Sequence, residues 1–147
     1  MTPRCTLAFI SGLHVVTAVV ALDYAVERGL AMDAVGIRRS ADDIPRDAYL
    51  LGTGVTPPVI FIGVQALAAT VVLCRPSRVA TRTLGVLGAV MVVGYAIERE
   101  TRRALHPGHW DSRVTPLTGS GAALALSMAV LGLRTAPPAT LDRSRHR

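Results

Sequence analysis

CTLAFISGLHVVTAVVAL, residues 5–22, is a nearly unbroken apolar stretch. Three more stretches of the same kind follow at residues 55–74, 79–97 and 114–133. Each is close to the length of about 20 residues that a helix needs to cross about 30 Å of hydrocarbon. The sequence therefore predicts an all-α fold, an integral membrane four-helix bundle in which successive spans run up, down, up and down.

The composition fits a single membrane domain in a chain of 147 residues. Half of the residues are apolar and only 4% are aromatic, so packing must rest on small and aliphatic side chains, which let helices approach closely in lipid. We assign residues 1–134 to one four-span domain and residues 135–147 to a disordered basic tail. All 16 basic residues are arginines, which together with the abundant Ala, Val and Gly suggests a GC-rich bacterial genome.

The net charge of +6 raises the question of nucleic-acid binding. The arginines flank the apolar stretches and form no stripe interleaved with aromatic side chains. The predicted partner is therefore the lipid bilayer and not nucleic acid. A homodimer or a larger complex is compatible with this pattern.

Two connections are predicted to add short helices. Residues 40–43, Ser-Ala-Asp-Asp, resemble a capping box, and a short interfacial helix is expected to follow as far as Leu51. Helical structure is also predicted to continue past the third span into residues 98–103. A Pro-Gly turn at residues 106–109 then leads to the fourth span.

The orientation of the spans is inferred from the charged residues that flank them. Four spans place both termini on one side, and each side carries eight of the arginines, so the positive-inside rule does not decide. The short, purely basic turn at residues 75–78 favours cytoplasmic termini in a multi-pass protein of the cell membrane. A signal peptide cleaved after Ala21 is an alternative for the first stretch, although its apolar run is long and its positive region thin.

His14 is the only ionisable residue near the middle of a predicted span. Exposure of such a group to lipid costs several kcal/mol, so His14 should face the bundle interior. It either handles protons or a ligand, or it is a neutral imidazole bonded to another helix, with Gln65 at similar depth as a partner. Since bis-histidine haem needs two imidazoles at matching depth, one chain alone cannot supply that site.

A polar mouth is predicted where the third span ends. In a continuous helix Tyr95, Glu98 and Arg102 share one face, and Asp23 ends the first span on the same side of the membrane. Glu98 is a candidate acid or base, while Tyr95, Arg102 and Asp23 are candidate ligand-binding residues. The alternative is a solvated helix extension without a site.

Three residues in the following loop are candidate metal ligands. His106 and His109 flank the Pro-Gly turn, and Asp111 follows. Their spacing matches no established zinc motif, so the sequence predicts no metal site and leaves the cofactor unknown.

In size and number of spans the chain is similar to small four-helix membrane families such as the DoxX-like proteins and the small multidrug transporters. The likeness is architectural only, because the multidrug family relies on a glutamate in its first helix where this chain has His14. We expect a protein that binds or transforms a lipophilic small molecule in a cavity between helices, open on the side of the 23–54 and 98–113 loops. The alternatives are a non-catalytic subunit of a larger complex and a dimeric proton-coupled transporter.

Overall fold

The computed structural model describes residues 2–34, 37–38, 40 and 44–135. The described part of the chain consists of helices joined by turns and irregular connections, with one antiparallel pair of two-residue strands. Its elements are α1 (Pro3–Arg28), β1 (Asp33–Ala34), β2 (Ile37–Arg38), α2 (Ile44–Leu50), α3 (Val59–Cys74), α4 (Arg78–Ile97), α5 (Arg99–Ala104) and α6 (Val114–Thr135). The predicted tail lies outside the described residues, except that Thr135 still belongs to α6.

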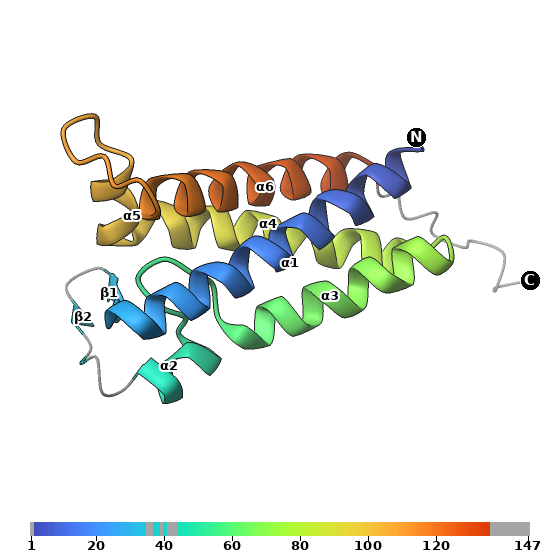
Figure 1. Ribbon diagram of the computed structural model, residues 1–147. Helices are drawn as coiled ribbons and strands as arrows, with labels where there is room; N and C mark the ends of the chain where they lie inside the picture. The colour runs from blue at the N-terminus through green and yellow to red at the C-terminus, as the bar shows by residue number, and fades with distance from the viewer. Residues whose placement is uncertain (1, 35–36, 39, 41–43, 136–147) are drawn as a thin grey trace, which may run out of the picture.

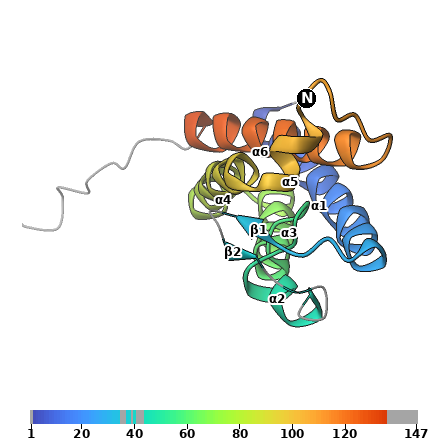
Figure 2. The same cartoon turned by 90° about the vertical axis from the view of Figure 1, so that its left-hand side faces the viewer.

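The four long helices α1, α3, α4 and α6 lie side by side (Figure 1). Helix α6 packs on α4 and α1, and α3 packs on α1 and α4. The short elements α2, β1, β2 and α5 gather at one end of this group (Figure 2). The start of α1 and the end of α6 lie at the other end.

Three of these helices, α1, α4 and α6, are long and apolar enough to cross a membrane. The predicted fourth span at residues 55–74 corresponds to α3, an apolar helix of only 16 residues. At 1.5 Å per residue it extends about 24 Å, less than the hydrocarbon core. The reason is local: Pro57 and Pro58 keep the preceding residues out of the helical region, so the helix begins after them.

Helix α1 is longer than its apolar stretch. It continues past Leu22 through residues that contain no helix breaker and ends at Gly29, which adopts the left-handed conformation at φ 66°. At its start the Thr2 hydroxyl accepts from the Cys5 backbone N–H, and Pro3 occupies the first turn. The apolar stretch therefore underestimates the length of α1, whose ends are set by the capping residues Thr2 and Gly29.

Helical structure is present after α4 as predicted, in α5, but the two helices are not continuous. Glu98 has φ −70° and ψ 127°, which is extended backbone, and the helix breaks there before α5 begins at Arg99. The local sequence consists of good helix formers, so a tertiary contact overrides the propensity. Because the break changes the direction of the chain, Tyr95, Glu98 and Arg102 do not share one helical face.

The first connection contains the short helix predicted there, α2, which ends at Leu50. Its proposed capping box, residues 40–43, falls largely outside the described residues. After α2 the chain turns at Gly52, whose φ of 84° favours glycine. The backbone N–H of Gly54 then donates to the Leu30 carbonyl at 3.0 Å, which fastens this connection to the end of α1.

Glycines set the closest helix contact, between α4 and α6. A Cβ on Gly88 would lie 2.6 Å from the Ala125 carbonyl oxygen, and a Cβ on Gly132 would lie 2.5 Å from the Gly85 backbone. These distances leave no room for any side chain. The small residues therefore act as predicted for helices that pack without a hydrophobic driving force.

Candidate functional site

The predicted pair of His14 and Gln65 meets inside the bundle, where both side chains have no exposed surface. The His14 Nδ1 lies 3.1 Å from the Gln65 Oε1, which links α1 to α3. The Gln65 Nε2 donates to the Ser11 carbonyl at 2.8 Å and approaches the Met128 sulfur at 3.4 Å. One amide thus connects three of the long helices.

These contacts fix the tautomer of His14. A backbone carbonyl can only accept, so the Gln65 nitrogen faces Ser11 and the Gln65 oxygen faces the imidazole. The His14 Nδ1 must then carry a hydrogen, and Nε2 is left as an acceptor in the neutral ring. Nε2 and the Ser11 hydroxyl have no hydrogen-bond partner among the described residues.

A cavity of about 280 Å³ lies beside Glu98, at the end of the bundle that carries α2 and α5. Its walls come from Met32, from the end of α2 and the connection that follows it, from the start of α3, from the second half of α4 and from Thr101 on α5. They are mainly apolar, with Val55, Phe61 and Met91 among them. His14 and Gln65 are not among the lining residues, so the two predicted polar sites are separate.

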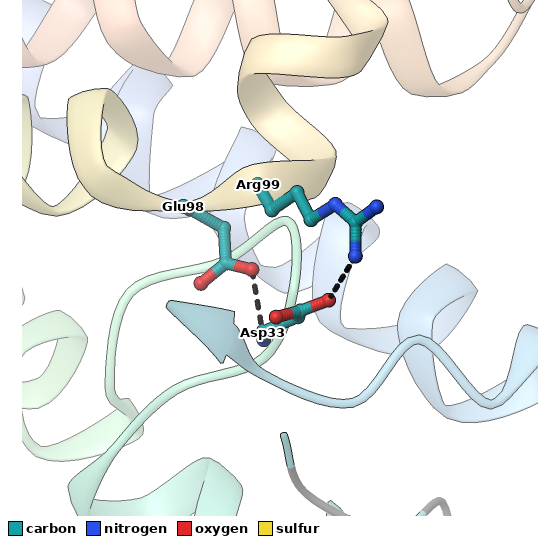
Figure 3. Close-up of polar contacts among 3 residues, drawn as sticks. All are labelled: Asp33, Glu98 and Arg99. Carbon is teal, nitrogen blue, oxygen red and sulfur yellow. Dashed lines mark hydrogen bonds and ion pairs between the residues drawn. The ribbon is translucent and has the colours of Figure 1, made fainter. Parts of the chain in front are cut away.

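Glu98 is the charged group of this cavity, and its side chain is only 7% exposed. Its Oε1 accepts a hydrogen bond of 2.9 Å from the backbone N–H of Asp33 on β1 (Figure 3). Burial raises the pKa of the Glu98 carboxyl, and this hydrogen bond opposes the rise only in part. The contact to β1 also explains why α4 ends here.

The side chain of Asp33 has a second role next to Glu98. Its Oδ2 lies 3.3 Å from the Arg99 Nη1, so Asp33 is bound to the chain on both sides of the helix break (Figure 3). The negative charge of Asp33 adds to the rise of the Glu98 pKa. A carboxyl in these surroundings is biased towards its neutral form, in which it can donate a hydrogen bond.

Four further polar side chains line the same cavity, and Thr101 and Tyr95 are two of them. The Thr101 hydroxyl is buried and has no hydrogen-bond partner within the described part of the chain. Tyr95 is 8% exposed, and a Cβ on Gly121 would lie 2.5 Å from its hydroxyl oxygen, so that glycine makes room for the ring. The ring also meets His14 edge-on at a centroid distance of 6.4 Å, which places Tyr95 between the cavity and the bundle interior.

The other two predicted ligand-binding residues lie elsewhere. Arg102 is exposed and lines a separate, open cavity together with Arg99, Arg103, His106 and His109. Asp23 is exposed on α1 and lines neither the cavity beside Glu98 nor the one that Arg102 lines. The structure thus groups Tyr95 with Glu98 and separates both from Arg102 and Asp23.

Two of the three candidate metal ligands, His106 and Asp111, make local hydrogen bonds. The Asp111 Oδ1 accepts from the backbone N–H groups of Arg113 and Val114, both at 2.8 Å, and so caps α6. The Val114 and Arg113 N–H bonds lower the pKa of the Asp111 carboxyl. Within the described residues no group of three or more His, Cys, Asp or Glu side chains has the arrangement of a metal site.

Several residues that form the cavity were not predicted from the sequence. Thr101 sits in a charged segment, and Gly94 looks like one more packing glycine, although a Cβ on it would meet nothing within 4 Å. The break at Glu98 is what turns these positions towards a common space. The one local sign of the cavity was the position of Glu98, which follows an apolar stretch and precedes a charged segment.

Comparisons with protein-family models, with curated proteins and with solved structures found no match for this chain. The geometry of the chain itself therefore carries the functional argument.

Proposed function

We propose that this chain is a four-span membrane protein that binds a lipophilic small molecule in the cavity beside Glu98. The observation that carries the proposal is a mainly apolar space of about 280 Å³ with a buried carboxyl and an unpartnered hydroxyl, those of Glu98 and Thr101, at its wall. Apolar walls with a few convergent polar groups are typical of small-molecule sites. The apolar body of the ligand would occupy the space, and its polar group would bond to Glu98 and Thr101.

The proposed four-span bundle rests on the alternating direction of the long helices and on their outer surface. Successive long helices run back and forth between the two ends (Figure 1). Helix α3 also presents exposed apolar side chains, with Leu67 66% and Leu73 59% exposed. An apolar outer face suits lipid, and thinning of the bilayer or flanking residues can compensate for the shorter span. Cytoplasmic termini remain part of the proposal.

The rim of the cavity favours entry from the membrane. Four apolar side chains that line it are also exposed at the surface: Leu50, Leu51, Val90 and Ile97. In a bilayer such a rim would face acyl chains near the headgroups. A lipophilic ligand could thus pass from the membrane to Glu98 without crossing water.

The experiment fills the cavity from Gly94. Gly94→Leu adds a side chain where a Cβ meets nothing within 4 Å, whereas Gly63→Leu on α3 does the same at a position that does not line the cavity. Both proteins are purified from membranes and analysed by mass spectrometry for bound apolar molecules. We expect a molecule that accompanies the wild type and Gly63→Leu but is lost from Gly94→Leu. Equal retention in both variants, or no bound molecule in the wild type, would contradict the proposal.

Binding and transformation are distinguished by Glu98→Gln. The amide keeps the shape and the hydrogen-bond acceptor for Asp33 but cannot transfer a proton. If the protein only binds, the variant retains the molecule in the same chemical form. If Glu98 is an acid or base, the variant accumulates an unconverted form that differs in mass or in retention time.

A second candidate, a proton-coupled transporter that uses His14, is favoured by one observation. The His14 Nε2 is buried without a partner among the described residues, so it is available to a proton or a ligand. Flux measured in proteoliposomes under a pH gradient should then be lost in His14→Gln, which keeps a polar group without a titratable one. Unchanged flux would leave His14 as a structural link between α1 and α3.

A further inference from the structure

A second surface of the molecule carries a concentration of positive charge that the proposed ligand cavity does not use. Helix α5 places Arg99, Arg102 and Arg103 at spacings of three and four residues, which puts them on one face. The opposite face of α5, with Thr101 and Ala104, is buried. The cationic side chains therefore project together, away from the bundle.

The loop after α5 completes this surface. It brings His106 and His109 beside the three arginines, and these five side chains alone line an open cavity of about 520 Å³. This volume lies within the range of about 300 to 1,000 Å³ that is usual for ligand sites. No acidic side chain is among the lining residues.

The positive charge of the cavity is only partly balanced. Arg99 pairs with Asp33 at 3.3 Å, whereas Arg102 and Arg103 have no ion pair with an acid among the described residues. Like charges at such spacing repel one another, so an anion bound between them would be stabilised. Guanidinium groups also match the geometry of phosphate oxygens, to which they bond through two N–H groups at once.

His106 is oriented so that its ring can donate a hydrogen bond to a bound anion. The His106 Nδ1 accepts from the Gly108 backbone N–H at 3.3 Å, so the hydrogen of the neutral ring resides on Nε2 and can be donated to an anion. Trp110 in the same loop is 72% exposed, as expected of a side chain that anchors a loop at the level of the lipid headgroups. The cavity thus combines donors for a phosphate group with a neighbour suited to the membrane surface.

We infer that this cavity, formed by Arg99, Arg102, Arg103, His106 and His109, binds a phosphate group. The phosphate can belong to an anionic lipid headgroup or be free in solution, since both present the same oxygens. The site is independent of the cavity beside Glu98, and neither proposal depends on the other.

The test compares two lipids and two sets of variants. The full-length protein is placed in nanodiscs of phosphatidylcholine with increasing phosphatidylglycerol, and the lipid it retains after mild detergent release is counted by native mass spectrometry. Arg102→Gln and Arg103→Gln are made singly, so that each leaves the buried face of α5 intact. Arg134→Gln, an exposed arginine in the last turn of α6, is the matched control.

We expect phosphatidylglycerol to be retained in preference to phosphatidylcholine, and each of the two variants to bind it about tenfold more weakly, as for the loss of one charge-assisted hydrogen bond. The Arg134→Gln control should match the wild type. A parallel arm titrates inorganic phosphate in pure phosphatidylcholine nanodiscs, with sulfate-free buffer and calorimetric detection. Binding of inorganic phosphate that weakens in Arg102→Gln assigns the site to free phosphate, and arginine-dependent retention of phosphatidylglycerol alone assigns it to a headgroup. Equal retention of the two lipids without phosphate binding, or equal losses in Arg134→Gln and Arg102→Gln, would overturn the inference.

Discussion

Helix α4 packs in two different ways along its length. At Gly85 and Gly88 its backbone touches the backbone of α6, whereas at Gly94, less than two turns later, a Cβ would meet nothing within 4 Å. The first two glycines let a neighbouring helix in, and the third leaves room beside the cavity. The same residue type thus closes one half of the bundle and opens the other.

Buried polar groups differ between the two halves in the same way. The Gln65 amide bonds to the His14 Nδ1 and to the Ser11 carbonyl in a closed interior. Glu98 is fastened by one hydrogen bond to β1 and otherwise borders the cavity. A polar group that neighbours enclose on all sides holds helices together, whereas one that borders a free volume can meet a ligand. Substitutions in each half separate these roles.

The largest effect is expected from Gly88→Leu compared with Gly94→Leu. A leucine at position 88 would push against the backbone of Ala125 and Ala129, atoms that cannot move without separating α4 from α6. We expect a loss of about 3 kcal/mol in the free energy of unfolding, the upper end of the range for overpacked sites. At Gly94 the loss should be small and partly offset, because leucine favours the helix by up to about 1 kcal/mol relative to glycine.

Unfolding in mixed micelles titrated with SDS would measure both values. Similar losses at the two glycines would mean that Gly94 is as tightly packed as Gly88 in the folded protein.

A smaller loss is expected from Gln65→Leu. The substitution removes the bonds to His14 and to the Ser11 carbonyl and leaves the His14 Nδ1–H without an acceptor. An unpaired buried donor costs about 1–3 kcal/mol, and interhelical bonds in membranes contribute less, about 0.6 kcal/mol on average. We therefore expect a loss of about 1–2 kcal/mol in the same assay.

Thr70→Val provides the control for Gln65→Leu. Thr70 is also on α3, but its hydroxyl bonds only to the Ala66 carbonyl within the helix, so the change should be close to neutral. If Gln65→Leu is equally neutral, the polar cluster does not hold the helices together.

Glu98→Gln should change the pH dependence of stability. Because burial raises the folded-state pKa of Glu98 above its unfolded value, the folded state prefers the proton. Below the unfolded pKa both states are protonated and there is no penalty. As the pH rises through the raised folded-state pKa, the full penalty for the buried charge develops, so stability falls.

We expect the wild type to lose stability relative to Glu98→Gln as the pH rises above the unfolded-state pKa of the carboxyl, and the two to agree at the acidic end. The effect should be smaller than that of Gln65→Leu, since the Asp33 N–H offsets part of the penalty. Parallel stability curves over this range would show that Glu98 is solvated in the folded protein.

The sequence predicted the closed half better than the open half. Apolar length and small residues indicated the helices, and the depths of His14 and Gln65 along their spans brought them together correctly. The helix break at Glu98 was not predicted, because a run of strong helix formers follows it and the opposing contact comes from Asp33, 65 residues away. The cavity forms where this break lies next to the start of α3 after Pro57 and Pro58. The two segments are far apart in the sequence, so no local sequence pattern predicts that they meet.

The smallest effect is expected from Asp33→Asn, which tests what holds the open half in place. The side chain of Asp33 pairs with an Arg99 that is 56% exposed, and exposed ion pairs contribute about 0–1 kcal/mol. The bond to Glu98 comes from the Asp33 backbone N–H, which the substitution leaves in place. We therefore expect a loss below about 0.5 kcal/mol in the SDS titration and unchanged retention of the ligand. A larger loss would mean that the side chain of Asp33, and not its backbone bond to Glu98, fastens β1 to the helix break, and the open half would then depend on charges at its surface.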